Sequence, residues 1–468
     1  MKKVLLILSL IITVHISSAQ SSRDLIKGSW IGKLTTGAID LRIVFNITAD
    51  EYDSLIVTLD SPDQGAEGIK VGPINITGRD FIIMAPTLRA EYQGSLVNDT
   101  TINGTFSQGG MALKLNLTRL TTEFSTRKPQ EPVRPYPYKD EEVTFRNEKG
   151  KAILAGTLTI PQGNGPFPAV ILITGSGAQN RNEELMGHKP FLVIADYLTR
   201  QGIAVLRYDD RGVGKSTGDI FTSTSLDFAS DAEAALEFLK KDKRIKQGSI
   251  GMIGHSEGSM IAAIVASSRN DVDFIVSLSG AGLTGDIIIK NQAADLSRTS
   301  GVSGKKIKEN EKVNSVLFSI LKKEKDNNKA SEKMVDAYIK MAGQLKLSPE
   351  EAEIGLQQVK SSVQPITLNW LRYFVSTNPA DFWKKVKCPV LALNGSLDLQ
   401  VAAGVNLKAI EKALKSGGNT NVKTIEMPGL NHLFQHCKTG LPAEYSTIDE
   451  TFSPEALNII AGWVKELR

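Results

Sequence analysis

SIGMIGHSEGSMIAAIVA is the sequence of residues 249–266, and it contains a G-x-S-x-G motif centred on Ser256. The apolar run at 250–253 predicts a buried strand, and the small residues at 259–266 predict a helix. A strand, a tight turn and a helix around this motif form a nucleophile elbow, in which a strained turn lifts the serine hydroxyl to the edge of the sheet. Glycines at 254 and 258 would let strand and helix approach without Cβ clashes. Ser256 is the predicted nucleophile; the alternative is a glycine-rich turn without chemistry.

A serine hydroxyl needs a base that is itself held by a third group. In chains with this elbow the partners follow in the order serine, acid, histidine. Four histidines follow the first twenty residues: His188, His255, His432 and His436. His188 precedes the serine, and the side chain of His255, next to it in the chain, is expected to point away. His432, directly after a predicted strand at 422–427, is the predicted base, and His436 is expected in a surface loop.

The predicted acid is Asp398, which follows a predicted strand at 390–393 and stands 34 residues before His432. It would hold the imidazole in one tautomer and stabilise the imidazolium ion. The alternative is that Asp398 is a turn residue beside Ser396. No other acid occupies the position after that strand, which favours the catalytic assignment.

The oxyanion hole is predicted to use two backbone N–H groups. One is that of Glu257, directly after the nucleophile. The other comes from the loop at 174–177 after the apolar run at 169–173, with Ser176 as the predicted donor and Gly177 as the alternative. The loop could also be a plain tight turn.

The pattern around these motifs predicts an α/β fold with a doubly wound, mostly parallel sheet. The additional predicted strands are 203–206 and 274–278, and the predicted helices include 191–198 and 232–239. A helix-rich insertion at 283–380 would form a cap over the carboxyl ends of the strands, where ligands bind in such sheets. Its aromatic residues Trp370, Tyr373 and Phe374 are candidates for a substrate pocket or for the helical core.

The N-terminal part has a different pattern. Apolar residues alternate with polar ones at 39–47, 55–59 and 113–117, which predicts strands of a small all-β barrel or sandwich over 21–125. No His or Cys lies in this segment, so it is interpreted as an accessory domain. The proline-rich stretch 126–139 predicts a stiff linker, and 140–468 forms the predicted catalytic domain.

Residues 1–19 have the pattern of a cleaved signal peptide: two lysines, an apolar run and small residues before Gln20. The apolar run is too short for a stable membrane span. The bacterial type of this leader predicts a periplasmic or extracellular protein. Without Lys2 and Lys3 the formal charge falls from +4 to +2, which does not favour nucleic-acid binding.

The sequence offers no cofactor or metal site. GVGKS at 212–216 resembles part of a phosphate-binding loop, but the required first glycine is Asp209. No His or Cys spacing indicates a metal. Cys388 and Cys437 could pair in an oxidising compartment, but their predicted positions at opposite ends of the sheet argue against a disulfide.

The elbow, the YDDRGVGKS loop at 208–216, and Cys388-Pro389-Val390 leading into Asn394-Gly395 resemble the α/β-hydrolase family, closest to bacterial esterases and serine-aminopeptidase-like members with a helical cap. The resemblance covers about residues 140–468. One departure is Thr174-Gly175, where many relatives have His-Gly. Because backbone amides form the oxyanion hole, this departure leaves the mechanism intact but weakens any inference about the substrate.

The resulting prediction is a secreted serine hydrolase that cleaves small-molecule carboxylic esters through an acyl-enzyme. An aspartate nucleophile, as in dehalogenases and epoxide hydrolases of this fold, is excluded by Ser256. Two alternatives remain: a peptidase or amidase using the same triad, and a protein whose β-domain binds a surface ligand beside an inactive hydrolase domain.

Overall fold

A computed structural model describes residues 22–467 apart from 37–38, 65, 109–110 and 122–127. The predicted signal peptide therefore lies outside the described residues. The chain divides into two compact units, one comprising residues 1–61 and 66–124 and the other 62–65 and 125–468. No helix among the described residues is long and apolar enough to cross a membrane.

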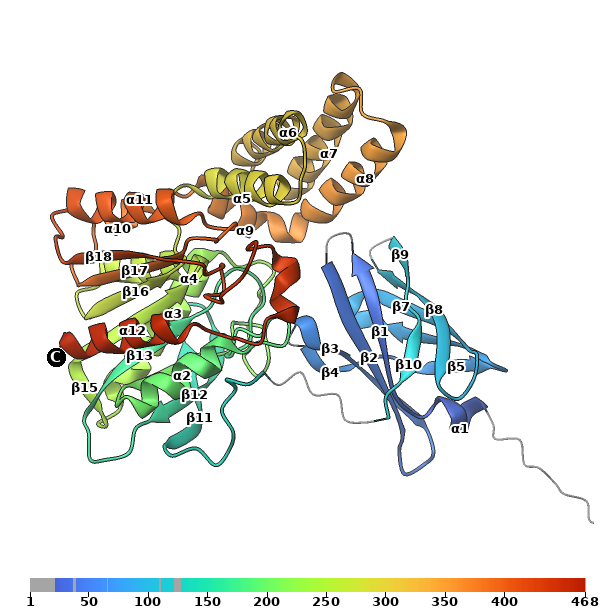
Figure 1. Cartoon of the computed structure of the whole chain (residues 1–468), viewed down its shortest axis with the longest axis horizontal. Helices are drawn as coiled ribbons and strands as arrows, with labels where there is room; N and C mark the ends of the chain where they lie inside the picture. The colour runs from blue at the N-terminus through green and yellow to red at the C-terminus, as the bar shows by residue number, and fades with distance from the viewer. Residues whose placement is uncertain (1–21, 37–38, 65, 109–110, 122–127, 468) are drawn as a thin grey trace, which may run out of the picture. The chain divides into compact units, whose positions relative to one another are not determined.

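The first unit contains a short helix, α1 (Ser22–Ile26), and one continuous antiparallel sheet in the order β4-β3-β2-β1-β10-β8-β7-β6-β5, with β9 paired to β8. Its strands are β1 (Gly28–Thr36), β2 (Ile39–Ala49), β3 (Leu55–Ser61), β4 (Ala66–Lys70), β5 (Ile74–Thr77), β6 (Asp80–Ala85), β7 (Ala90–Leu96), β8 (Thr101–Gln108), β9 (Met111–Lys114) and β10 (Leu117–Arg119). The single sheet curls around its own apolar side as a half-barrel (Figure 1). The sandwich alternative, which requires two sheets, is therefore wrong.

The predicted alternation of apolar and polar side chains corresponds in β3 to buried Val57 and Leu59 between less buried neighbours. The strand predicted at 113–117 differs. It is divided into β9, which pairs with β8, and β10, which lies between β8 and β1. Both strands pair with β8 in the same register, with Lys114 opposite Thr105 and Leu117 opposite Ile102, and β10 pairs with β1 as well.

The second unit is built on an eight-stranded sheet in the order β11-β12-β14-β13-β15-β16-β17-β18. The strands are β11 (Lys139–Asn147), β12 (Ala152–Ile160), β13 (Phe167–Ile173), β14 (Ala204–Tyr208), β15 (Ile245–His255), β16 (Phe274–Leu278), β17 (Val390–Gly395) and β18 (Val422–Met427). The β11-β12 and β12-β14 pairs are antiparallel, and the pairs from β14 to β18 are parallel. The β11-β12 hairpin was not predicted from the sequence.

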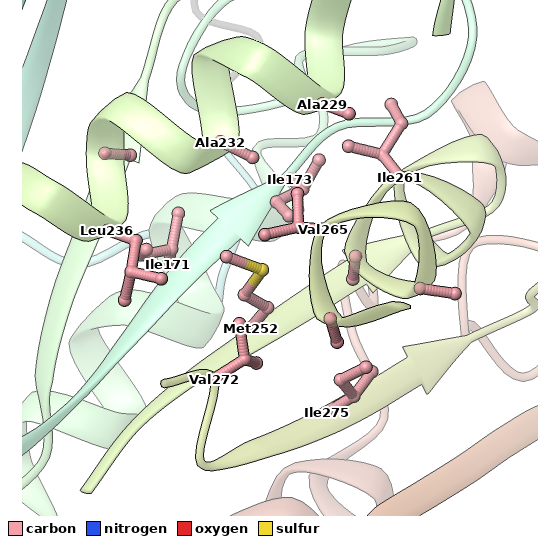
Figure 2. Close-up of a cluster of buried hydrophobic side chains, with 14 of the residues drawn as sticks. Ile171, Ile173, Ala229, Ala232, Leu236, Met252, Ile261, Val265, Val272 and Ile275 are labelled. Atoms are coloured by element: carbon pink, nitrogen blue, oxygen red, sulfur yellow. The ribbon is translucent and has the colours of Figure 1, made fainter. Parts of the chain in front are cut away.

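Helices cover both faces of this sheet. One face packs on α2 (Pro190–Arg200) and α12 (Pro454–Glu466), and the other on α3 (Ser225–Lys241), α4 (Glu257–Ser268) and α11 (Ala403–Ser416). Figure 2 shows the second face, where Ile171, Met252 and Ile275 of the strands meet Leu236 of α3 and Val265 of α4. Strands apolar on both faces explain the unbroken apolar runs of the sequence.

The predicted insertion is helical. It contains α5 (Gly285–Thr299), α6 (Gly304–Lys323), α7 (Asn327–Gln344), α8 (Pro349–Ser362), α9 (Leu368–Ser376) and α10 (Ala380–Trp383). These helices lie between β16 and β17 in the chain, and α5 to α9 form the cap (Figure 1). The cap has its own apolar core, which includes Leu317, Leu321, Met334 and Leu368.

Part of the predicted linker packs against the second unit. The Lys128 ammonium donates to the carbonyl oxygen of Ile448 at 2.6 Å, and the Gln130 amide donates to that of Phe452 at 2.8 Å. These contacts fix residues 128–131 against the second unit. This part of the predicted linker is therefore not a free spacer.

Candidate active site

The elbow around Ser256 joins β15 to α4. Ser256 has φ 53° and ψ −116°, a strained conformation for a residue with a Cβ. A Cβ on Gly254 would lie 2.2 Å from the backbone of Gly258, and one on Gly258 would lie 2.2 Å from the carbonyl oxygen of Ile173. Both flanking glycines are therefore required by close backbone contacts, as the motif predicts.

His432 and Asp398 meet beside this elbow. Nδ1 of His432 lies 2.8 Å from Oδ2 of Asp398, and both residues are buried. The other carboxylate oxygen of Asp398 accepts hydrogen bonds from the backbone N–H groups of Gln400 and Val401, each at 2.8 Å. An acceptor fixed in this way favours the tautomer with the proton on Nδ1, which leaves Nε2 as the basic nitrogen.

Ser256 and His432 line one cavity of about 240 Å³. Glu257 and Ser176 also line it, so the structure brings four of the five predicted site residues to one cavity, while Asp398 is hydrogen-bonded to His432. The cap contributes the remaining wall, with lining residues Ile288, Ile289, Trp370 and Phe374. The cavity lies where the carboxyl ends of β13 and β15 meet the cap.

The loop after β13 lies against the elbow. A Cβ on Gly175 would lie 3.3 Å from the Cβ of Ser256. The Ser176 hydroxyl donates to Oε2 of Glu257 at 2.7 Å, which joins the two segments that carry the predicted oxyanion donors. Gly177 has φ 106°, a conformation that favours glycine. The loop after β13 therefore lies beside Ser256 and is tied to Glu257.

The carboxylate of Glu257 is a feature that sequence reasoning missed, since only its backbone N–H was considered. Glu257 is 2% exposed and accepts hydrogen bonds from the hydroxyls of Ser176 and Ser225, at 2.7 and 2.6 Å. The indole N–H of Trp370, on α9, donates to both carboxylate oxygens at 3.0 and 3.1 Å. One buried carboxylate thus joins the elbow, the oxyanion loop, α3 and the cap.

His255 does not point away from the site, contrary to the expectation from its position in the chain. Its ring lines the cavity 4.8 Å from the ring of His432. Nε2 lies 3.0 Å from the backbone carbonyl oxygen of His432, and Nδ1 lies 2.9 Å from Oε1 of Glu183. The turn at Ser256 directs the two neighbouring side chains differently, but both remain at the site.

Burial by itself lowers the pKa of His255, but the charge of Glu183 and the hydrogen bonds outweigh it and raise the pKa above its ordinary value. Oε1 of Glu183 also accepts the backbone N–H of Gly175 at 2.7 Å. The His255–Glu183 pair therefore connects the loop that carries His432 with the loop after β13. Glu183 lies only eight residues from Gly175, but 72 residues from His255, so the pair with His255 has no signature in the linear sequence.

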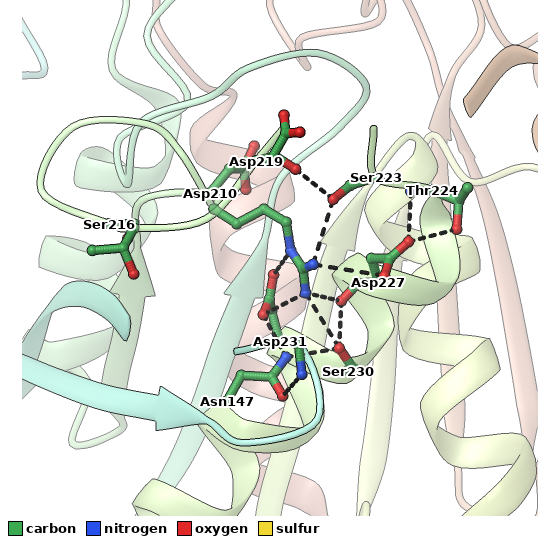
Figure 3. A network of polar contacts seen from close by, with 12 residues as sticks. Asn147, Asp210, Ser216, Asp219, Ser223, Thr224, Asp227, Ser230 and Asp231 are labelled. Atoms are coloured by element: carbon green, nitrogen blue, oxygen red, sulfur yellow. Dashed lines mark hydrogen bonds and ion pairs between the residues drawn. The ribbon is translucent and has the colours of Figure 1, made fainter. Parts of the chain in front are cut away.

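The side chains of the YDDRGVGKS loop are held by hydrogen bonds within the second unit. The Arg211 guanidinium donates to both oxygens of Asp231, at 2.7 and 2.9 Å, and the Asn147 amide donates to the same carboxylate at 2.7 Å. Figure 3 shows Asn147 and Asp231 within this network. The neighbouring Asp210 accepts from the Thr174 hydroxyl at 2.7 Å, and burial raises its pKa well above the ordinary range. The hydrogen bond between Thr174 and Asp210 thereby links the 208–216 loop to the loop after β13.

The other two histidines have partners elsewhere. Nε2 of buried His188 lies 2.8 Å from the carbonyl oxygen of Tyr445, and exposed His436 lies 2.9 Å from Oε1 of Glu450. Cys388 and Cys437 are free thiols, so the structure contains no disulfide between them. Burial raises the pKa of the two thiols to about 12 and about 11.

Two of the three candidate aromatics reach the cavity. Trp370 and Phe374 line it and stack with ring centroids 5.3 Å apart. Tyr373 is not among the described lining residues. The described residues contain no cluster of three or more His, Cys, Asp or Glu side chains that could hold a metal ion.

The sheet, the elbow and the cap define a protein of the α/β-hydrolase class, with a serine as the candidate nucleophile. The chain belongs to the family described as X-Pro dipeptidyl-peptidase (S15 family), whose model matches residues 150–425.

Named relatives of this chain include enzymes that act on esters and thioesters. Esterase EstD of Thermotoga maritima is 26% identical over 305 residues, which cover 64% of this chain and 61% of that protein. A peroxisomal succinyl-coenzyme A thioesterase of Mus musculus is 29% identical over 134 residues, which cover 29% of this chain and 28% of that protein. The alignments thus span about three fifths of the first relative and about a quarter of the second.

Solved structures with a similar fold include an esterase of Pyrococcus furiosus, with 16% identity, a TM-score of 0.43, and coverage of 74% of this chain and 99% of that one. Another is Est1E of Butyrivibrio proteoclasticus with ferulic acid bound, with 18% identity, a TM-score of 0.41, and coverage of 69% and 96%.

Proposed function

We propose that this protein hydrolyses carboxylic esters, with Ser256 as nucleophile, His432 as general base and Asp398 as the acid that orients it. The observation that carries the proposal is the buried hydrogen bond between His432 and Asp398, in a cavity that His432 shares with a strained Ser256. This combination of nucleophile, base and orienting acid is what acyl transfer requires.

The reaction proceeds in two steps. Oγ of Ser256 attacks the ester carbonyl carbon while Nε2 of His432 accepts its proton, and the oxyanion is held by the N–H groups of Glu257 and Ser176. The intermediate collapses, and His432 returns the proton to the departing alcohol. Water then attacks the acyl-enzyme with His432 again as base, which releases the carboxylic acid and restores the serine hydroxyl.

The charges in the cavity favour neutral esters over peptides with a free terminus. Of the described residues that line it, none is Lys or Arg, and the acids are Glu183 and Glu257. Both carboxylates already accept hydrogen bonds from the protein, Glu183 from Gly175 and Glu257 from Trp370 and two serines. At Glu257, a peptide ammonium group would have to compete with the three groups that donate to both of its oxygens, at the cost of leaving buried polar groups unpaired.

Dipeptidyl-peptidase activity is the second candidate, because the family model that matches most of the chain is described by that activity. The same three residues would serve, since esters and amides are cleaved by one mechanism. The two candidates differ in the substrate that the cavity binds, which is a neutral ester in the first and a peptide with a free terminus in the second.

The test compares p-nitrophenyl esters with glycyl-prolyl p-nitroanilide, using the wild type and Ser256→Ala. We expect ester turnover that falls by about a thousandfold or more in the variant, since the other groups provide only residual catalysis. Turnover of the anilide alone would assign the peptidase activity. If folded wild-type protein turned over neither substrate, both assignments would be rejected and ligand binding by the β-unit would become the leading hypothesis.

We also propose that residues 1–19 are cleaved during export, so that the mature protein begins at Gln20 in the periplasm or outside the cell. The support is the pattern of basic, apolar and small residues at the start of the chain. The intact mass of protein recovered from the periplasmic fraction tests this, because an uncleaved chain there would contradict it.

A further inference from the structure

The cap contains a second and larger cavity. Its volume is about 690 Å³, and it is lined by residues of α5, α6, α7, α8 and α9. Most of the lining side chains are apolar, among them Val313, Leu317, Met334, Leu347 and Val359. This volume is within the range of about 300–1,000 Å³ that ligand sites typically have. The catalytic cavity, at about 240 Å³, is smaller than that range.

The two cavities meet at the same side chains. Ile289 of α5 and Trp370 of α9 line both. Trp370 is also the residue whose indole donates to Glu257, directly after the nucleophile. The large cavity is thus continuous with the wall of the catalytic site rather than an isolated void in the cap.

The cap cavity is elongated along α6. Its lining residues on that helix run from Lys306 to Phe318 at helical spacing, which corresponds to about 18 Å at a rise of roughly 1.5 Å per residue. The C-terminal part of α6 packs on α9, because the Arg372 guanidinium donates to the carbonyl oxygens of Leu321 and Glu324. The end near Leu317 therefore lies toward the catalytic cavity.

The opposite end is charged. Nζ of Lys306 lies 2.9 Å from Oε1 of Glu351, and both residues line the cavity. Between this pair and Trp370 the cavity extends along α6 and is lined mainly by apolar side chains, with Asn310, Asn314 and Gln358 among the polar ones. A linear hydrocarbon chain fits such a shape, whereas a compact polar group would leave most of it unfilled.

We propose that the cap cavity accepts a long linear hydrocarbon chain of the ester substrate, which passes Ile289 and Trp370 from the catalytic cavity and extends along α6 toward Lys306. This inference rests on the proposed ester hydrolysis and specifies its substrate class. Each methylene group that is buried gains about fourfold in binding. Long-chain esters are therefore expected to be better substrates than acetyl esters.

The test measures kcat/KM on acetyl, butyryl, octanoyl and dodecanoyl p-nitrophenyl esters, with the wild type and Ala293→Phe. Ala293 lines the cap cavity on α5, one turn beyond Ile289, and does not line the catalytic cavity. The added ring should obstruct the cap cavity and lower dodecanoyl turnover by about tenfold or more while acetyl turnover stays within about twofold of wild type. Dodecyl acetate, assayed in parallel, shows whether the chain enters from the acyl or the alcohol side.

The matched control is Val316→Phe, which adds a ring at a position 38% exposed on α6 that does not line the cavity. Asn314→Phe narrows the same cavity from another wall and replaces Ala293→Phe if that variant does not fold. The proposal would be overturned by a wild type that favours a long chain on neither the acyl nor the alcohol side, or by the same chain-length profile in both cavity variants and the control.

A separate readout distinguishes this proposal from the proposed catalysis. Binding of dodecanoate to Ser256→Ala is measured by calorimetry, with Ala293→Phe in the same background. Binding that the second substitution weakens by about tenfold supports the cap site even if no ester is hydrolysed. Equal binding with and without Phe at that position, or none at all, rejects the cap site while leaving ester hydrolysis to its own assay.

Discussion

At the scale of single residues, the four histidines show that the surroundings of a side chain determine which contacts it makes. His432, His255, His188 and His436 have the same side chain, but of the four only His432 pairs with an acid that two backbone N–H groups hold in place. Chain order left His432 and His436 as candidates for the base, and the predicted strand at 422–427 favoured His432. The contacts of His255 could not be predicted, because they depend on Glu183, which reaches the site only through the fold.

His188 makes a prediction about pH. Burial lowers its pKa from 6.5 to about 4, so the folded protein holds the neutral ring. The unfolded chain takes up a proton as the pH falls through 6.5, whereas the folded chain does so only near pH 4. The stability associated with this group is therefore present above pH 6.5 and is lost as the pH falls toward 4, by up to roughly 3 kcal/mol.

The experiment compares the thermal unfolding midpoints of wild type and His188→Gln at about pH 7 and about pH 5, on either side of the ordinary histidine pKa. We expect a smaller acid-induced decrease in the variant, because glutamine does not titrate. All other groups titrate equally in both proteins, so an identical decrease would contradict the assignment.

At the scale of elements, the elbow depends on two backbones that touch. In Gly258→Ala the new Cβ would lie 2.2 Å from the carbonyl oxygen of Ile173. Backbone atoms of β13 cannot yield without displacing the sheet, so we expect a loss of about 3 kcal/mol or more in unfolding free energy. The measurement is chemical denaturation of the purified variant.

The control for this prediction is Gly462→Ala, in α12, where nothing lies within 4 Å of the added Cβ. This substitution should stabilise the protein by about 0.5–1 kcal/mol, because alanine is the better helix former. If Gly258→Ala were as stable as this control, the close contact at the elbow would be contradicted.

Elements also show what the sequence could and could not predict. Continuous apolar runs predicted β13, β15, β16 and β17, because buried strands need apolar side chains on both faces. The β11-β12 hairpin was missed at the edge of the sheet. The Glu257–Trp370 contact was also missed, because it joins residues 113 positions apart and no local pattern encodes such a distance.

At the scale of the whole molecule, every residue of the candidate site belongs to the second unit, residues 125–468 with 62–65. We propose that the proline-rich stretch 126–139 joins two domains, with the β-unit as an accessory. A fragment of residues 125–468 is then expected to hydrolyse acetyl esters with kcat/KM within about twofold of the full chain. Steady-state assays of both proteins, with Ser256→Ala in the fragment as control, measure this.

A folded fragment without activity would contradict that independence and give the β-unit a part in catalysis. Binding of a surface ligand that survives Ser256→Ala in the full chain and is lost in the fragment would instead assign the β-unit a recognition function. The strands that the structure describes in that unit contain no His or Cys side chain, and a fold by itself does not define a function.

The cap leaves the sheet after β16 and returns at β17, two strands that are paired neighbours, with Ile275 opposite Val390. Because the chain leaves and re-enters the sheet at adjacent strands, the insertion is a separate unit whose two ends lie close together. A different helical segment with the same separation of its ends would join the same two strands, provided that it supplied a donor to Glu257 in place of Trp370. Replacing the cap by recombination would then change which substrates fit, while the candidate residues Ser256, Asp398 and His432 stay the same.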